Sequence, residues 1–281
     1  MISVQDLCFS YTGRPFMEGV TFDVPRGEIF GFLGPSGAGK STLQKILTGL
    51  IKKYRGRVTV NGQEVSRHDG SFHEDIGVDF EFPSLYEKLT ARENLRFFGS
   101  LYRQCRDIDE LLDSVGLLSE ADKRVADYSK GMKSRLNFIK ALLHDPVTLF
   151  LDEPTSGLDP SNARAMKDII LAEKEKGKTI ILTTHNMYDA TELCGRVAFI
   201  VDGNIRALDT PRNLIMSKGA LTVDYVYRNN GEETVGQTTL SQTGNDAVLL
   251  GLIRENRLLA IHSSEPTLND IFVEITGRQL Q

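Results

Sequence analysis

Apolar residues along most of the chain fall into two kinds of pattern. Glu28–Leu33, Val147–Leu151 and Thr179–Thr183 are nearly continuous apolar runs, which is typical of parallel strands buried on both faces. Ser41–Leu50 and Ser129–Leu143 instead carry apolar residues at the spacing of a helix. Because strands and helices alternate, the pattern predicts an α/β fold around a central sheet.

Further segments extend this prediction. We expect a strand at Val20–Val24, and a second at Arg57–Val60 that runs into an Asn61-Gly62 turn. Leu89–Leu118 is expected to be helical, and Tyr11 is expected to close the first strand of the chain. Together these segments favour one large domain.

The pattern changes near a helix expected at Pro211–Lys218, where the main domain should end. Beyond it, short strands alternate with short helices. We therefore expect a domain over 1–215 and a small α+β extension of ββαβα order over 216–281. The expected elements of the extension are strands at Leu221–Tyr227 and Thr234–Leu240 around an Asn230-Gly231 turn, a helix at Asp246–Arg254, a strand at Arg257–His262, and a helix after Pro266.

The composition limits the classes of protein to which the chain can belong. Of 281 residues, 33 are Lys or Arg and 38 are Asp or Glu, and the net charge of −5 argues against a general nucleic-acid binder. No apolar run approaches the roughly 20 residues of a membrane-spanning helix, and no secretory signal is visible. The three cysteines form no CxxC pair. We therefore expect a soluble, cytoplasmic chain with reduced thiols.

One glycine-rich segment predicts a phosphate-binding loop. The segment Gly34–Ser41 fits the pattern GxxxxGK[ST] and stands between a predicted strand and a predicted helix, as that motif requires. Its glycines let backbone amides surround a phosphate, and the helix directs its positive end at the anion. Lys40 would reach the terminal phosphates and Ser41 would bind Mg²⁺. The expected nucleotide-binding residues here are Gly34, Pro35, Ser36, Gly37, Ala38, Gly39, Lys40, Ser41 and Thr42. With an acidic strand, such a loop would equally suit a GTPase, a kinase or a helicase.

Two carboxylates follow the apolar run that ends at Leu151. Asp152 would hold Mg²⁺, and Glu153 would polarise a water molecule for attack on the γ-phosphate. Taken alone, this pair is equally compatible with a strand that ends in a solvated acidic turn. The phosphate loop makes the catalytic interpretation the better one, and Glu153 is the predicted catalytic base.

Four more features follow a recognisable order along the chain, namely Tyr11, Tyr128–Met132, Ser156–Asp159 and His185. With the phosphate loop and the acidic strand, this order resembles the nucleotide-binding subunit of ATP-binding cassette (ABC) transporters over roughly Met1–Lys218. The resemblance implies a P-loop NTPase fold, a mixed sheet core, and a helical subdomain at about 83–145. Taken one by one, Tyr11 could be an edge-strand aromatic and His185 a strand-end histidine.

The resemblance also implies roles for these residues. Tyr11 would stack on adenine, and His185 would contact the γ-phosphate as a second catalytic residue. Two subunits would sandwich ATP head to tail, with Asp159 at the dimer seam. The family's signature segment, which contacts the partner's ATP, would consist here of Ser129, Lys130, Gly131 and Met132.

Two departures from the family pattern affect the predicted site. The common signature is LSGGQ, whereas Lys130 replaces a glycine here and Met132 replaces a glutamine. We expect the site to function because Ser129 and Gly131 remain, although a weakly hydrolysing site is the alternative. Glu81 stands where the family carries glutamine, and its oxygens would still suit Mg²⁺. We expect this added charge to make turnover unusually dependent on Mg²⁺.

The end of the chain resembles that of bacterial exporter ATPases. The implied protein is an ATPase that forms a homodimer or an ATP-induced dimer, with ATP and Mg²⁺ as cofactors. It would power export through separate transmembrane permease subunits, bind no nucleic acid, and lie at the cytoplasmic face of the cell membrane only through its partner. The alternatives are a soluble non-transport ABC ATPase linked to iron–sulfur assembly, DNA or ribosomes, and a weakly active regulatory cassette.

Overall fold

The computed structural model describes residues 1–80, 84–218, 221–229, 231–264 and 266–277. The chain divides into two compact units, here called unit 1 (Met1–Leu208) and unit 2 (the described residues from Asp209 to Gly277). None of the helices in the described ranges is both long enough and apolar enough to cross a membrane.

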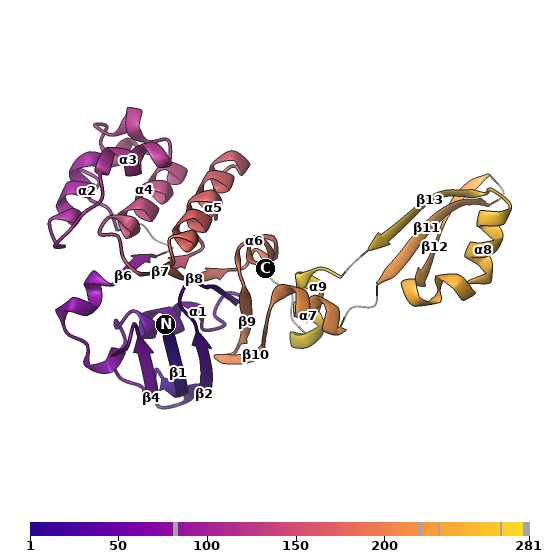
Figure 1. The fold of residues 1–281 in the computed structure, drawn as a ribbon, viewed down its shortest axis with the longest axis horizontal. Coiled ribbons are helices and arrows are strands. Elements are labelled where there is room, and N and C mark those ends of the chain that lie inside the picture. The colour runs from indigo at the N-terminus through magenta and orange to yellow at the C-terminus, as the bar shows by residue number, and fades with distance from the viewer. Residues whose placement is uncertain (81–83, 219–220, 230, 265, 278–281) are drawn as a thin grey trace. The chain divides into compact units, whose positions relative to one another are not determined.

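Unit 1 is built around a six-stranded sheet with the order β10-β9-β3-β8-β7-β6 (Figure 1). The neighbouring strands from β9 to β6 pair in parallel. Every residue of β3, β7 and β8 is buried, which explains the continuous apolar runs in the sequence. The strands are β3 (Ile29–Leu33), β6 (Ile76–Asp79), β7 (Thr148–Asp152), β8 (Thr179–Thr184), β9 (Arg196–Val201) and β10 (Asn204–Asp209).

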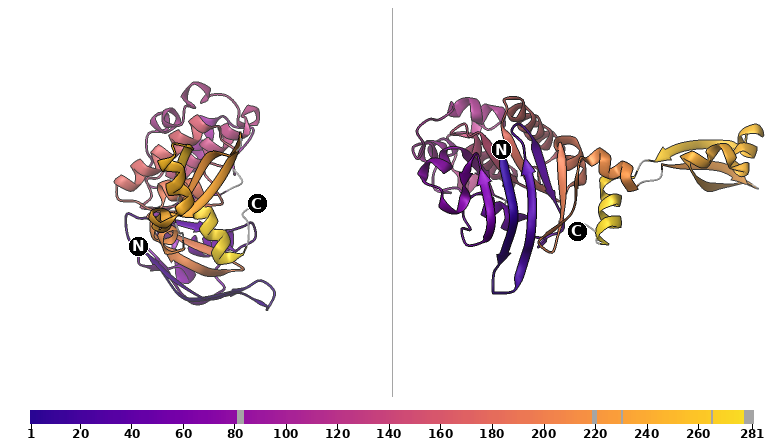
Figure 2. Two further views of the ribbon diagram at one scale, coloured as in Figure 1. Left: turned by 90° about the vertical axis from the view of Figure 1, so that its right-hand side faces the viewer. Right: turned by 60° about the horizontal axis from the view of Figure 1, so that its bottom comes forward.

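A second, antiparallel sheet of unit 1 has the order β2-β1-β4-β5. Its longer strands alternate buried and exposed residues, as expected where one face meets the core. These strands run side by side in the right-hand view of Figure 2. The strands of this second sheet therefore pair antiparallel, whereas the central-sheet strands from β9 to β6 pair in parallel. The strands are β1 (Ile2–Ser10), β2 (Pro15–Val24), β4 (Arg55–Val60) and β5 (Gln63–Glu64).

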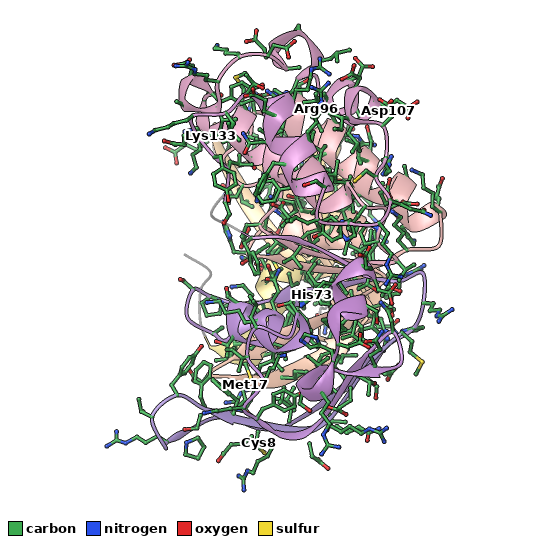
Figure 3. The ribbon with its side chains drawn as sticks, turned by 90° about the vertical axis from the view of Figure 1, so that its left-hand side faces the viewer. Cys8, Met17, His73, Arg96, Asp107 and Lys133 are labelled. Atoms are coloured by element: carbon green, nitrogen blue, oxygen red, sulfur yellow. The ribbon has the colours of Figure 1, made fainter. Side chains whose placement is uncertain are left out.

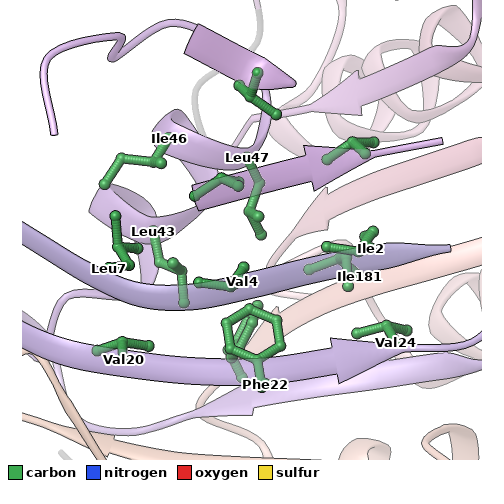
Figure 4. Packing of buried hydrophobic residues seen from close by; sticks show 14 of the residues in the cluster. Ile2, Val4, Leu7, Val20, Phe22, Val24, Leu43, Ile46, Leu47 and Ile181 are labelled. Atoms are coloured by element: carbon green, nitrogen blue, oxygen red, sulfur yellow. The ribbon is translucent and has the colours of Figure 1, made fainter. Parts of the chain in front are cut away.

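One hydrophobic cluster joins the two sheets to helix α1 (Lys40–Leu47). It contains Val4 of β1, Phe22 of β2, Leu43 of α1 and Ile181 of β8 (Figure 4). Full burial of such a side chain stabilises the fold by about 1.5–3 kcal/mol. The helix that follows the glycine-rich loop is therefore anchored by the core of unit 1.

Four helices of unit 1 stand together above β6, β7 and β8 in the view of Figure 1. Arg96 and Lys133 of this region appear together in Figure 3. The four are α2 (Ala91–Gly99), α3 (Ile108–Ser114), α4 (Lys130–Leu142) and α5 (Pro160–Glu175). Unit 1 also contains α6 (Met187–Leu193) and short 3-10 helices η1 (Val65–Arg67), η2 (Gly70–Glu74), η3 (Leu118–Glu120) and η4 (Val125–Asp127).

The expectation of helix throughout Leu89–Leu118 is wrong, because α2 and α3 are separate helices. After α2 the chain turns back so closely that a Cβ atom on Gly99 would lie 2.8 Å from Sγ of Cys105. Asp107 then starts α3 by accepting the amides of Asp109 and Glu110 at 2.8 and 2.9 Å. A side-chain cap within the apolar pattern thus divides it into two helices.

Unit 2 contains a three-stranded antiparallel sheet of order β12-β11-β13. Helix α8 packs on this sheet through a cluster of Tyr225, Leu249 and Leu252. Two further helices, α7 and α9, lie against each other. The elements are α7 (Pro211–Lys218), β11 (Thr222–Asn229), β12 (Glu232–Thr239), η5 (Leu240–Asn245), α8 (Ala247–Arg254), β13 (Leu258–Ser264) and α9 (Leu268–Thr276).

Candidate nucleotide site

A cavity of about 310 Å³ lies where the carboxyl ends of β3, β7 and β8 meet at one edge of the central sheet. Ligands of α/β sheets bind at this edge because the loops that follow parallel strands converge there. The structure thus brings together most of the predicted phosphate loop, both carboxylates and the histidine. The lining residues are Ser36, Gly37, Ala38, Gly39, Lys40, Ser41, Thr42, Asp152, Glu153, Ser156 and His185.

The backbone of the glycine-rich loop explains its composition. Gly39 immediately precedes α1 and has a φ of +114°, which a residue with a side chain rarely adopts. At Gly34, an added Cβ atom would lie 2.2 Å from the carbonyl oxygen of Ile200. Both positions therefore require glycine, one for its conformation and the other for its close approach to β9.

Lys40 and the first turn of α1 face the cavity. Nζ of Lys40 donates hydrogen bonds to the carbonyl oxygens of Gly34 and Pro35, at 2.6 and 3.1 Å. Ser41 is exposed and lines the cavity, whereas Thr42 is buried at its rim. An ammonium group, a hydroxyl and the positive end of a helix therefore converge on one space, an arrangement suited to an anion.

Tyr11 contacts α1 from the antiparallel sheet. Its hydroxyl lies 2.6 Å from Oγ1 of Thr42, and its ring packs edge-on against Phe9. Tyr11 is nevertheless 62% exposed, so part of it is accessible to a planar ligand. Tyr11 is not among the described residues that line the cavity, and its contact with adenine stays a prediction.

The two carboxylates after β7 have different partners. Asp152 is 8% exposed, and one of its carboxylate oxygens accepts a hydrogen bond from the hydroxyl of Thr183 on β8. Oε1 of Glu153 lies 2.7 Å from Nδ1 of His185, and its Oε2 accepts from Oγ1 of Thr184 at 3.2 Å. Neighbouring threonines of β8 therefore orient both acidic side chains.

The described residues suit a magnesium ion held largely by its nucleotide. Ser41 and Asp152 provide oxygen atoms in the same cavity, and oxygen is the ligand that Mg²⁺ prefers. Within the described ranges, no three or more His, Cys, Asp or Glu side chains are clustered as a metal cage. Magnesium bound to nucleotide phosphates needs few protein ligands, so the two observations agree. The third predicted ligand, Glu81, lies outside the described residues.

The sequence analysis did not identify a buried aspartate beside this site. Asp79 ends β6, and its carboxylate accepts a hydrogen bond from Nδ2 of Asn137 on α4 at 2.5 Å. Burial raises the pKa of Asp79 to about 7; the charge of Lys140 and the Asn137 hydrogen bond oppose this rise, and the charge of Asp152 adds to it. Burial also lowers the pKa of Lys140, against the charge of Asp79. The only signal in the sequence is one acidic residue within an apolar strand.

The predicted signature residues lie at the start of α4 rather than at the cavity. Ser129 caps this helix, and its Oγ accepts the backbone amide of Met132 at 3.2 Å. Lys130 and Gly131 lie against the Ser156–Asp159 segment. A Cβ atom on Gly157 would lie 3.7 Å from Nζ of Lys130, and a Cβ atom on Gly131 would lie 3.4 Å from the side chain of Leu158. None of the four signature residues is among the described residues that line the cavity.

Asp159 is the last residue of the Ser156–Asp159 segment, and it caps α5, which begins at Pro160. Its Oδ1 accepts the amides of Ser161 and Asn162, both at 3.1 Å. Hydrogen bonds from the Asn162 side chain and backbone lower the pKa of Asp159. The carboxylate is therefore ionised and held at a helix start, and its predicted place at a dimer seam remains a prediction.

Three residues near the site were not singled out as site residues from the sequence. Ser156 lines the cavity, and Thr183 and Thr184 hold the two carboxylates. Their positions offered a signal, since the threonines directly precede His185 and the serine follows the acidic pair. Which carboxylate each threonine would contact depends on the pairing of β7 with β8.

Comparisons with known proteins agree with this arrangement. The profile of the ABC transporter family matches residues 17–156. The chain is 49% identical to the fluoroquinolones export ATP-binding protein of Mycobacterium tuberculosis, over 100% of this chain and 94% of that protein. It is 35% identical to the Nod factor export ATP-binding protein I of Rhizobium sp. (strain N33), over 97% of this chain and 95% of that protein.

A solved structure of an ATP-binding subunit of an ABC transporter has a similar fold. The two share a TM-score of 0.71 and 32% identity, over 77% of this chain and 92% of the other. The similarity therefore extends from the sequence motifs to the arrangement of the elements that carry them.

Proposed function

The chain belongs to the ABC transporter family as an export-type, ATP-hydrolysing subunit, and we propose that two copies close around ATP to drive export through separate membrane-spanning subunits. One observation carries the proposal. The cavity at the edge of the central sheet combines a phosphate loop with Asp152, Glu153 and His185. This set can bind the phosphates of ATP and activate water beside them.

The phosphates of ATP would occupy the space between the loop and the start of α1. Lys40 now donates to Gly34 and Pro35, and on ATP binding its ammonium group would turn from these carbonyls to the β- and γ-phosphates. Backbone amides of the loop and the positive N-terminal end of α1 would stabilise the remaining negative charge. Tyr11 would support the adenine ring.

Ser41 and Asp152 are the residues that we propose hold Mg²⁺, with Glu81 as a further ligand predicted from the sequence alone. The ion, when bound with ATP, supplies positive charge at the β- and γ-phosphates. Thr183 orients the Asp152 carboxylate for this role through its hydroxyl.

Hydrolysis would transfer the γ-phosphoryl group of ATP to water. Glu153 would accept a proton from that water while the water oxygen bonds to the γ-phosphorus. The bond between the γ-phosphorus and the ADP oxygen breaks in the same reaction. His185 would contact the γ-phosphate, so its present contact with Glu153 at 2.7 Å would have to open. Thr184 would keep the Glu153 carboxylate in place during this exchange.

The signature residues support a site shared between two copies. Ser129 caps a 13-residue helix, and none of the signature residues at this helix start is among the described residues that line the cavity of their own chain. A second copy could present its ATP to this helix start, where amides and the Ser129 hydroxyl suit phosphate. Asp159 would lie at the same seam. ATP would then hold the dimer together, and hydrolysis would release it.

An exposed aromatic group in the helical region is the surface that we propose for the membrane partner. Tyr86 and Phe97 pack edge-on at 4.9 Å and are 50% and 42% exposed, and Leu101 beside α2 is 64% exposed. Exposed apolar groups of this kind are typical of interaction surfaces. The protein would lie at the cytoplasmic face of the membrane through this contact. Relatives named for export favour a transporter over the non-transport alternatives.

Replacement of the proposed base tests this function. Glu153→Gln keeps the side-chain size and removes the group that accepts the proton. We expect ATP to bind as before while phosphate release falls at least about 100-fold, since a general base contributes typically 10²–10⁴-fold. The variant should also elute as a dimer in the presence of ATP and Mg²⁺.

Glu175→Gln is the matched control, because it makes the same chemical change at an exposed position at the end of α5. It should hydrolyse ATP at the normal rate. Normal turnover by Glu153→Gln would show that another group is the base.

A further inference from the structure

Two loops that carry the proposed hydrolytic residues leave neighbouring strands of the central sheet. One follows β7 and holds Glu153 and Thr155; the other follows β8 and holds His185. The strands are parallel and adjacent, with Asp152 opposite Thr183. Both loops therefore start at the same edge of the sheet.

A second side-chain contact joins these loops, apart from the one between Glu153 and His185. The Thr155 hydroxyl donates to Oδ2 of Asp189 at 2.6 Å, and Asp189 lies in the first turn of α6. Asp189 is 7% exposed, and Nζ of Lys167 on α5 donates to its other oxygen at 3.3 Å. A buried carboxylate therefore ties the Thr155 loop to the start of α6 and to α5.

The backbone conformation of Glu153 requires support from neighbouring contacts such as the one between Thr155 and Asp189. Its φ of +52° lies in the left-handed region, which costs free energy for any residue with a side chain. Contacts on either side must therefore hold the backbone in place. Thr155 is separated from Glu153 by Pro154 alone, so its bond to Asp189 constrains this turn.

We propose that Thr155, Asp189 and Lys167 form a positioning cluster that fixes the loop of Glu153 against the loop of His185 for hydrolysis. The inference rests on the proposed function of these two residues. No member of the cluster is among the described residues that line the cavity, so each acts through the residues that do. A displacement of about 1 Å in such a site can lower a rate about 100-fold.

Thr155→Val tests the cluster because it removes the hydroxyl and keeps the size of the side chain. We expect kcat for ATP hydrolysis to fall at least about tenfold, while the Kd for ATP changes less than about twofold, because orientation rather than binding is lost. Thr155→Ser keeps the hydroxyl and should restore kcat to within about threefold of the wild type.

Asp189→Asn provides an independent variant, since it weakens the ion pair with Lys167 and leaves the volume unchanged. It should also lower kcat without weakening ATP binding. The double variant Thr155→Val, Asp189→Asn should be little worse than the poorer single variant, because residues that act as one unit are non-additive.

Thr191→Val is the matched control. The Thr191 hydroxyl bonds only within α6 among its described contacts, to the carbonyl of Met187 at 2.8 Å, so this variant should keep the normal kcat. A Thr155→Val protein with normal kcat would overturn the proposal, as would Thr155→Ser that is as slow as Thr155→Val. Loss of kcat together with an equal loss of ATP affinity would also overturn it.

ATP hydrolysis by the wild type and by Glu153→Gln tests the proposed function separately. If the wild type hydrolyses ATP and Glu153→Gln does not, a fully active Thr155→Val rejects the positioning cluster alone.

Discussion

At the scale of single residues, the end of α5 shows how unit 1 accommodates a buried charge. Glu173 is 1% exposed, and its Oε1 accepts from Nη1 of Arg106 and from Nζ of Lys176, both at 2.8 Å. Nζ of Lys178 lies 2.8 Å from its Oε2. Burial raises the pKa of Glu173, but hydrogen bonds from the two lysines and the charges of Lys178 and Arg106 outweigh it and lower the pKa to about 2.

This shift predicts a pH-dependent contribution to stability. Because the folded pKa lies below the ordinary value of 4.5, the ionised Glu173 stabilises the fold above about pH 5, and this contribution is lost as pH falls towards about 2. Glu173→Gln should therefore lower the free energy of unfolding by about 3 kcal/mol at pH 7.

Urea denaturation at several pH values measures the effect. The difference between the wild type and Glu173→Gln should shrink steadily below pH 5. Glu175→Gln changes an exposed charge on the same helix and should shift stability by no more than about 0.5 kcal/mol. A difference that stays constant with pH would contradict the assigned ionisation.

At the scale of elements, side-chain caps mark the starts of the α-helices of unit 1 from α2 to α6. Thr90 starts α2 by accepting the amide of Glu93 at 3.1 Å, and Ser129 starts α4 by accepting the amide of Met132 at 3.2 Å. The local geometry is similar at both starts. The proposed roles differ, because only the start of α4 is expected to meet a partner's ATP.

The two caps therefore form a matched pair of variants. Ser129→Ala and Thr90→Ala should each lower stability by about 1 kcal/mol, as is typical for a lost cap. Ser129→Ala should also reduce ATP hydrolysis more than about tenfold, whereas Thr90→Ala should leave it within about twofold. Urea denaturation and phosphate release measure the two effects. Equal turnover by both variants would mean that Ser129 serves only as a cap.

At the scale of the whole molecule, the two units have separate buried clusters. Leu43 belongs to the cluster of unit 1, and Leu249 to the smaller cluster that joins α8 to its sheet. Both side chains are nearly fully buried, at 1% and 2% exposure. Compact units with cores of their own can unfold separately.

Leu249→Ala should destabilise unit 2 alone, by about 2–5 kcal/mol, because the substitution leaves a cavity in its core. Hydrogen exchange should accelerate in β11, α8 and β13, while α1 and the affinity for ATP stay unchanged. Leu43→Ala is the converse variant and should accelerate exchange in unit 1 only. Faster exchange across both units in either variant would show that they unfold together.

The sequence by itself determined the features that are contiguous along the chain. The phosphate loop, the carboxylates after an apolar strand and the α/β pattern are local, because each depends on neighbouring residues and on the two periodicities of secondary structure. The family followed from the order of these segments. The predicted helix over Leu89–Leu118 failed because Asp107 caps a second helix inside one apolar pattern.

Only the tertiary structure decided which distant side chains meet. Thr155 and Asp189 are 34 residues apart in the chain, and Asp79 and Asn137 are 58 apart, yet each pair shares a hydrogen bond. These contacts depend on the strand order β8-β7-β6 and on which helix covers it. Apolar periodicity predicts that a strand is buried without specifying its neighbours, so the positioning of Glu153 could be seen only in the folded chain.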